Sequence, residues 1–229
     1  MSKIQYSEIE RAQQNYLKDL TMDEYLGSYN YKTMRKLFSL CGTGNKILDV
    51  GCGDGFIGKI LMDNGNDVIG VDLHEDQVKE TRKKGVKAIR ARVQQLPFKD
   101  ATFDIVTMAE VIEHFIETEI ALKEIMRVLK PGGKIIITTP NFASIRDRIL
   151  MIFGKLQAFA WHTDHVKFFN KERLVKVLKI TGYRSIHIHG SAFGFPIPKN
   201  AKVTYAFDGI FPAVWMQCLI AEAKKPMKK

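Results

Sequence analysis

The segment Lys46-Ile-Leu-Asp-Val-Gly-Cys-Gly-Asp-Gly55 decides the fold expected for this chain. A short apolar run ends in the acid Asp49, and glycines then follow at positions 51, 53 and 55. Glycine has no Cβ and accepts positive φ, so such a turn lets the backbone approach a ligand closely. The run before the turn predicts a strand and the residues after it a helix. Open α/β sheets bind nucleotide-like ligands at such a junction.

The rest of the chain alternates between strand-like and helix-like patterns. Two helices are expected before residue 46, carried by apolar residues at 16–26 and 34–38. The other expected helices cover 56–63, 73–84, 120–129 and 171–180. The expected strands cover 46–50, 67–71, 86–90, 103–107, 134–139, 184–189 and 214–222. This alternation predicts a doubly wound, Rossmann-like α/β fold: a mostly parallel sheet with helices on both faces.

At 229 residues the chain suits one domain. We expect an N-terminal helical cap (1–45), a cofactor-binding core (46–141), a lid-like insertion (142–165) and a C-terminal part of the sheet (166–229) with a substrate loop at 190–212. Insertions on a regular scaffold often select the substrate.

Composition argues against several classes of protein. The three cysteines are widely spaced and fit neither a disulfide framework nor a zinc knuckle. The start of the chain lacks the apolar region of a signal peptide, and no apolar run is long enough to span a bilayer. We therefore expect a cytoplasmic protein. The net charge of +10 lies largely on expected helix faces and at the C-terminus, so it favours solubility over nucleic-acid binding.

Two nucleotide fingerprints overlap in the glycine turn. Gly53-Asp-Gly-Phe-Ile-Gly58 formally satisfies the dinucleotide motif, but it begins too far from the strand. Asp49 and Asp54 would also place carboxylates beside a pyrophosphate, which charge repulsion disfavours. An acid-rich turn suits a cationic ligand such as S-adenosylmethionine, which has a sulfonium and an ammonium group. Asp72, at the end of the second strand, is placed to accept hydrogen bonds from a ribose.

The core resembles the class I S-adenosylmethionine-dependent methyltransferases of the ubiquinone/menaquinone-biosynthesis type (methyltransferase type 11). Four motifs match in order and spacing: Leu48-Asp-Val-Gly-Cys-Gly53, Leu96-Pro-Phe98 with Phe103-Asp-Ile-Val106, Glu110-Val-Ile-Glu-His114, and Arg127-Val-Leu-Lys-Pro-Gly-Gly133. The resemblance implies a seven-stranded sheet whose last strand is antiparallel. It also implies a set of cofactor-binding residues: Asp49, Gly51, Cys52, Gly53, Gly55, Asp72, Leu73, Val93, Gln94 and Ala109. Arg92 stands where the family often has an acid that accepts from adenine, and arginine cannot accept a hydrogen bond.

Glu110, Glu113 and His114 have the i, i+3, i+4 spacing of one helix face. Three interpretations stay open. His114 is a general base oriented by Glu113. Alternatively, all three residues bind a divalent ion such as Mg²⁺ that holds a catechol-like substrate, as the resemblance to quinone-pathway O-methyltransferases suggests. In the third interpretation they only cap the helix or form hydrogen bonds with the loop.

Two further groups of histidines lie outside this trio. The cluster Trp161-His-Thr-Asp-His165 could line the acceptor pocket, or its histidines could simply bond the backbone. His187 and His189 share one strand face, and we interpret them as structural.

The insertion carries a stripe of Ile145, Ile149, Ile152, Phe153 and Leu156 flanked by basic residues. It suits either a lid packed on the domain or, through 144–159, peripheral contact with an anionic membrane. Together these features predict methyl transfer to a small, hydrophobic or lipid-linked, quinone-precursor-like acceptor, with the oligomeric state undetermined. The alternatives are an RNA or protein methyltransferase and a non-catalytic module that binds S-adenosylmethionine or NAD.

Overall fold

The computed structural model describes residues 31–154, 165–191 and 217–227. The described elements follow in chain order as α3 (Tyr31–Cys41), β1 (Lys46–Val50), α4 (Phe56–Asp63), β2 (Asp67–Asp72), α5 (Glu75–Lys83), β3 (Lys87–Arg90), β4 (Phe103–Ala109), the 3-10 turn η1 (Ile112–His114), α6 (Thr118–Val128), β5 (Leu129–Pro140), α7 (Ile145–Ile152), α8 (Lys171–Ile180), β6 (Arg184–Ser191) and β7 (Cys218–Lys224).

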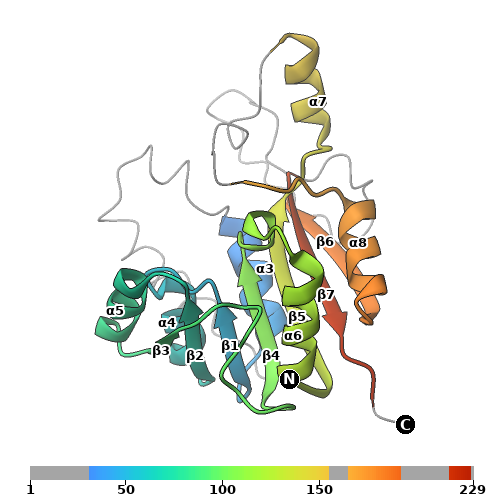
Figure 1. Ribbon diagram of the computed structural model, residues 1–229. Helices are drawn as coiled ribbons and strands as arrows, with labels where there is room; N and C mark the ends of the chain where they lie inside the picture. Colours follow the sequence, from blue (N-terminus) through green and yellow to red (C-terminus); the bar gives the residue numbers. More distant parts are fainter. Residues whose placement is uncertain (1–30, 155–164, 192–216, 228–229) are drawn as a thin grey trace.

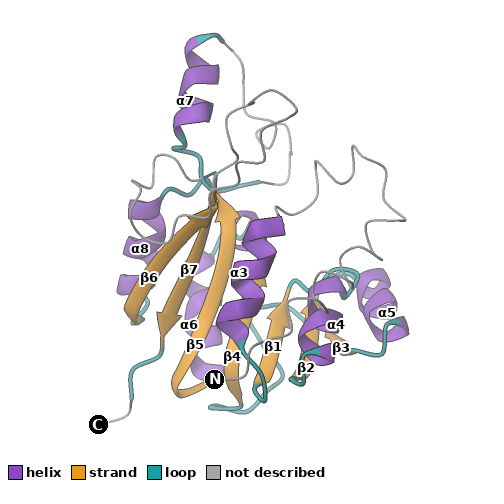
Figure 2. Ribbon diagram, turned by 180° about the vertical axis from the view of Figure 1, so that it is seen from behind, coloured by secondary structure: helices purple, strands orange, loops and turns teal. Residues whose placement is uncertain are grey.

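The strands form one seven-stranded sheet in the order β3-β2-β1-β4-β5-β7-β6. β1 to β5 pair in parallel, whereas β7 runs antiparallel to both β5 and β6. Helices α6 and α8 cover the face seen in Figure 1. Helices α3, α4 and α5 cover the opposite face, seen from behind in Figure 2. The strand order reverses between β1 and β4, the place where open sheets of this type bind ligands.

A period of two along the strands divides the apolar residues between these faces, because successive strand residues point to opposite sides. Ile47, Ile105 and Ile136 join the core beneath α3 and α4. Their neighbours Leu48 and Val106 join the larger core beneath α6 and α8. Both faces of the central strands are therefore buried, as in covered parallel sheets.

The predicted fold class is confirmed, and the differences lie at element ends. β5 begins at Leu129 rather than 134, because Leu129 already pairs with Phe103 of β4. The last strand begins at Cys218, whereas its predicted start at 214 lies outside the described residues. The first of the two predicted N-terminal helices also lies outside them, and α3 is the second.

Helix α7, from the insertion, projects beyond the end of the sheet (Figure 1). Its residues Ile149 and Ile152 are 44% and 79% exposed, and Phe153, directly after the helix, is 73% exposed. These apolar side chains lie at the surface of the described part of the insertion. Among the described helices, none combines the length and apolar character needed to cross a bilayer.

Candidate active site

The glycine turn after β1 has the backbone that its sequence predicts. Gly51, Gly53 and Gly55 adopt φ angles of 69°, 51° and 83°, and Gly55 caps the start of α4. These values lie in the left-handed region, which side chains other than glycine rarely adopt. The turn therefore needs glycine at all three positions for its conformation.

The three glycines differ in what surrounds them. A Cβ on Gly51 would lie 2.4 Å from Val111 Cγ2, and one on Gly55 would lie 2.8 Å from the Thr81 backbone. A Cβ on Gly53 would meet nothing closer than the Gln77 side chain, 3.9 Å away. Gly51 and Gly55 thus serve internal packing, whereas Gly53 leaves open space for a ligand.

Amide groups of this turn are already bonded within the protein. The N–H groups of Gly51 and Cys52 donate to Val71 O, and that of Gly55 donates to Cys52 O. The Gly53 N–H donates to Asp72 Oδ2 at 3.0 Å. A pyrophosphate site needs such amides free to point at the phosphates. The geometry therefore disfavours the dinucleotide alternative.

Asp49 lies beneath the turn at the end of β1 and is 1% exposed. Its Oδ1 accepts a 2.7 Å hydrogen bond from Thr107 Oγ1, and burial raises its pKa to about 7. Its Oδ2 has no hydrogen-bond partner among the described residues and lies 3.7 Å from where a Cβ on Gly58 would stand. A buried carboxylate in this position favours a positively charged ligand above it through charge rather than contact.

Asp72 ends β2 beside the turn. Besides the Gly53 amide, it accepts a 2.9 Å hydrogen bond from the His74 N–H through Oδ1. A carboxylate can accept up to four hydrogen bonds, so both oxygens retain capacity for ligand hydroxyls. The next residue, Leu73, is 46% exposed, as a side chain that covers a ligand ring would be in the unbound protein.

Cys52 points away from this surface. It is 5% exposed and packs with Val78 and Ala88 beneath α5, with its Sγ 3.5 Å from Thr81 Oγ1. Burial raises the pKa of this thiol to about 12, so it stays protonated. Any contact of Cys52 with a cofactor must come from its backbone.

The segment after β3 carries the predicted adenine contacts. Val93 is buried in the core, Gln94 is half-buried and Arg92 is exposed. Ala109, the last residue of β4, is 3% exposed and packs on the α3 and α4 side. Of these residues, Gln94 offers a partly accessible polar side chain.

The expected helix face at Glu110, Glu113 and His114 is wrong. Glu110 has a φ of 54°, and residues 112–114 form a single 3-10 turn instead of an α-helix. Glu110 bonds toward β5 and β7, accepting from Thr138 Oγ1 at 2.7 Å and from Cys218 Sγ at 3.5 Å. Burial raises the pKa of its carboxyl group. The i, i+3, i+4 spacing places three residues on one face only in an α-helix, so the expectation of a shared face was wrong here.

Glu113 and His114 instead meet His165. One ligand atom from each of these residues lies within 4.8 Å of the others, and the His114 and His165 ring centroids are 4.8 Å apart. Glu113 is 2% exposed and accepts from Thr139 Oγ1 at 3.0 Å. Its carbonyl accepts from the Val166 and Lys167 amides at 3.1 and 3.0 Å, which ties the segment after the insertion to η1.

A small cavity adjoins this cluster, lined by Glu113, Thr139, Pro140, Phe142, His165, Lys167, Phe168 and Phe169. Its walls combine three phenylalanines with a carboxylate and an imidazole. The sequence left two interpretations open for His165 and did not indicate Thr139. The available signal was Thr138-Thr-Pro140, a polar end to an otherwise apolar strand.

Among the described residues, the candidate histidines His187 and His189 are not part of this cluster. Residues 161–164 lie outside the described part of the chain. His187 lies opposite Glu222 on the paired strands β6 and β7. That placement agrees with a structural role.

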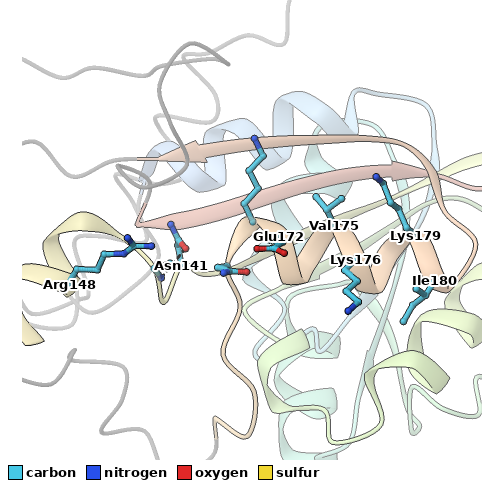
Figure 3. Close-up of a pocket in the computed structure, with 10 residues that line it drawn as sticks. Asn141, Arg148, Glu172, Val175, Lys176, Lys179 and Ile180 are labelled. Atoms are coloured by element: carbon cyan, nitrogen blue, oxygen red, sulfur yellow. Dashed lines mark hydrogen bonds between the residues drawn. The ribbon is translucent and has the colours of Figure 1, made fainter.

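A cavity of about 660 Å³ runs along α8 and is lined by Asn141, Ala143, Arg148, Asn170, Lys171, Glu172, Val175, Lys176, Lys179 and Ile180. Figure 3 shows Arg148 facing it from α7, and Glu172, Lys176 and Lys179 along α8. None of its described lining residues belongs to the glycine turn or to the Glu113–His114–His165 cluster. It is therefore separate from the candidate active site.

The glycine turn and the cluster are neighbours, because Val111 packs on Gly51 and directly precedes η1. The turn combines open space at Gly53, internally bonded amides and two carboxylates. These features fit a cationic nucleoside such as S-adenosylmethionine.

Comparisons with known proteins agree with this fit. Residues 48–137 match the model of a methyltransferase domain. The chain is 30% identical over 181 residues to a protein of Idiomarina loihiensis named ubiquinone biosynthesis O-methyltransferase, covering 71% of this chain and 73% of that protein. It is 31% identical over 145 residues to a probable S-adenosylmethionine-dependent methyltransferase of Mycolicibacterium smegmatis, covering 61% and 52%.

Solved structures show the same fold at lower identity. A Thermotoga maritima protein, described as an S-adenosylmethionine-dependent methyltransferase and possible histamine N-methyltransferase, superposes with a TM-score of 0.68. It is 22% identical, and the match covers 85% of this chain and 88% of that one. Taken with the sequence matches and the geometry of the glycine turn, this shows that the chain belongs to the family of S-adenosylmethionine-dependent methyltransferases.

Proposed function

We propose that the protein transfers a methyl group from S-adenosylmethionine to a hydroxyl oxygen of a small, apolar, phenolic acceptor of the quinone-precursor type. The observation that carries this proposal is the Glu113–His114–His165 cluster beside the glycine turn. It places an imidazole base next to a phenylalanine-lined cavity. The ubiquinone-biosynthesis O-methyltransferase among the relatives supports oxygen as the acceptor atom.

The reaction asks the protein to align two reactants and remove one proton. S-adenosylmethionine supplies an electrophilic methyl group and leaves as the neutral thioether. In our proposal Asp72 binds the ribose, and Asp49 stabilises the positive charge from beneath the turn. His114 takes the proton of the acceptor hydroxyl while its oxygen attacks the methyl carbon, and Glu113 and His165 hold the imidazole in place. Alignment supplies much of the acceleration, and a positioned base adds typically about 10²- to 10⁴-fold.

A metal-assisted version of this site is the second candidate, and the same cluster favours it. Two imidazoles and a carboxylate are donors that suit a first-row transition ion, whereas Mg²⁺ prefers oxygen ligands. The predicted trio therefore changes: His165 takes the place of Glu110 in the candidate ligand set. A bound ion would orient an acceptor hydroxyl and favour its deprotonated form.

An apolar acceptor also gives the exposed residues of α7 a role. Ile149, Ile152 and Phe153 are exposed beside Arg148 on the described part of the insertion. We propose that this helix makes peripheral contact with an anionic membrane that carries the acceptor. Co-flotation with phosphatidylglycerol vesicles, lost in Ile152→Ser/Phe153→Ser, tests this point. Equal flotation of wild type and variant would contradict it.

The decisive test is methyl transfer from S-adenosyl[methyl-³H]methionine to a prenylated catechol, to histamine and to RNA, after dialysis against EDTA and after adding back Mn²⁺, Zn²⁺ or Mg²⁺. The proposal expects label in the catechol ether. Activity without metal assigns the reaction to the imidazole base, and restoration by Mn²⁺ or Zn²⁺ assigns it to the metal version. Label in RNA or histamine would overturn the acceptor class, and no binding of S-adenosylmethionine would overturn the cofactor.

A further inference from the structure

Glu110 has a backbone conformation that glutamate rarely adopts. Its φ is 54°, directly after the last residue of β4. The left-handed region is unfavourable for a residue that carries a side chain, because its Cβ approaches the following carbonyl oxygen. Such strain persists where surrounding contacts hold the chain in place. The contacts that hold Glu110 therefore indicate the role of this backbone conformation.

Thr138 on β5 holds Glu110 at two points. The Glu110 N–H donates to the Thr138 carbonyl at 3.0 Å, and the Thr138 hydroxyl donates to Glu110 Oε1 at 2.7 Å. Cys218, the first residue of β7, adds a 3.5 Å contact from its thiol to the same carboxyl oxygen. Backbone and side chain are therefore both fixed to the sheet.

Thr139, the next residue of β5, holds Glu113 of the turn η1. Thr139 donates to Glu113 Oε2 at 3.0 Å. Because neighbouring strand residues point to opposite faces, Thr138 and Thr139 hold Glu110 and Glu113 on opposite sides of the sheet. Between them Val111 packs on Gly51 of the cofactor turn. The direction in which the chain leaves β4 thus sets the place of Val111, Glu113 and His114 together.

We propose that Glu110 is a positioning residue of the methyl-transfer site: fixed by Thr138 and Cys218, it sets the path of the chain into η1 and so the positions of Glu113 and His114. Its side chain touches neither the acceptor nor a metal ion. This inference rests on the proposed function, from which it takes the roles of Glu113 and His114 in methyl transfer.

The contacts argue against the alternative that Glu110 is a ligand or base. The grouping of potential ligand atoms among the described residues contains Glu113, His114 and His165 but not Glu110. The Glu110 oxygen that bonds Thr138 also receives the Cys218 thiol. The hydrogen bonds of the Glu110 side chain are thus made to β5 and β7.

Three variants test the inference. Glu110→Gln keeps the side-chain length and the acceptor oxygen but removes the carboxylate. Glu110→Ala removes the acceptor, and Thr138→Val removes the hydroxyl with little change in shape. We expect Glu110→Gln to keep kcat within about threefold of wild type, and Glu110→Ala and Thr138→Val to lower it about tenfold or more. Circular dichroism establishes that each variant is folded.

The second readout does not depend on activity. Ring resonances of ¹³C-labelled histidine, assigned to His114 with His114→Gln, report its position. They should move in Glu110→Ala and Thr138→Val and stay in Glu110→Gln. Loss of activity in Glu110→Gln equal to that in Glu110→Ala would overturn the inference, as would unmoved His114 resonances in Glu110→Ala. If the wild type transfers no methyl group, the proposed function fails, while the resonances still test the positioning.

Discussion

Asp49 and Thr107 form a buried pair across β1 and β4, with the threonine hydroxyl donating to Asp49 Oδ1 at 2.7 Å. The other oxygen, Oδ2, has no hydrogen-bond partner among the described residues. A buried, half-satisfied carboxylate destabilises the protein in its charged form. The free energy of unfolding should therefore depend on the ionisation of this one group.

We predict that Asp49→Asn stabilises the ligand-free protein above pH 7. The pKa of Asp49 rises from 3.8 to about 7 on folding. Between these values the folded chain binds more protons than the unfolded one, so stability falls as pH rises through this window. Each unit of pKa shift is worth about 1.4 kcal/mol, so we expect the variant to gain more than roughly 1 kcal/mol at pH 8. Urea denaturation between pH 4 and pH 8 measures this, and an unchanged pH slope in the variant would contradict it.

Substitutions of Gly51 and Gly53 should affect different properties, the first mainly stability and the second mainly ligand affinity. Gly51→Ala should destabilise the fold, because its methyl group meets Val111 at 2.4 Å. Adding Val111→Ala should restore part of the stability. Gly53→Ala has room for its methyl group but a φ of 51°, so it should lose affinity for S-adenosylmethionine with a smaller loss of stability. Thermal denaturation and calorimetric titration separate the two effects. Rescue of Gly53→Ala by Val111→Ala would contradict this assignment.

Substitution of Asp72 should change the affinity for S-adenosylmethionine, whereas substitution of His114 should change the rate of methyl transfer. We expect Asp72→Ala to raise the Kd for S-adenosylmethionine about tenfold or more, since the loss of a hydrogen bond to a charged group costs about 1.5–3 kcal/mol. His114→Ala should leave this Kd within about threefold and lower kcat at least about 100-fold, within the usual contribution of a general base. Equal effects of both variants on the Kd would mean that their roles are misassigned.

Arg127 should matter for stability alone. Its guanidinium forms a fork on Glu124, bonds the carbonyls of Leu96 and Phe98, and pairs with Asp100. A lysine cannot reproduce this planar set of donors. We expect Arg127→Lys to lower the free energy of unfolding by about 1–3 kcal/mol. Denaturant titration measures the loss, with the exposed Lys123→Arg as control. A change in Kd for S-adenosylmethionine without loss of stability would contradict this.

The sequence predicted the central sheet well because both faces of its strands are buried and their patterns are dense. The run at 46–50 and the three glycines that follow left few alternatives, and β1 and the turn appear where expected. The resemblance supplied the antiparallel last strand, which local patterns do not encode.

The acceptor side could not be predicted in the same way. Helical spacing suggested that Glu110 joins Glu113 and His114, but a left-handed residue followed by a 3-10 turn separates them. His165 lies 51 positions beyond His114 and reaches it through hydrogen bonds from the following amides to the Glu113 carbonyl. Contacts of such separation depend on tertiary structure, and no local period reveals them.

The two threonines at the end of β5 make the length of this strand critical. Removing one residue upstream within this strand would send each hydroxyl to the wrong side of the sheet, so Glu110 and Glu113 would lose their anchors in one event. Substitutions along β5 change one contact at a time, whereas a deletion reverses all of them. We therefore expect this strand to tolerate a change of residue far better than a change of length.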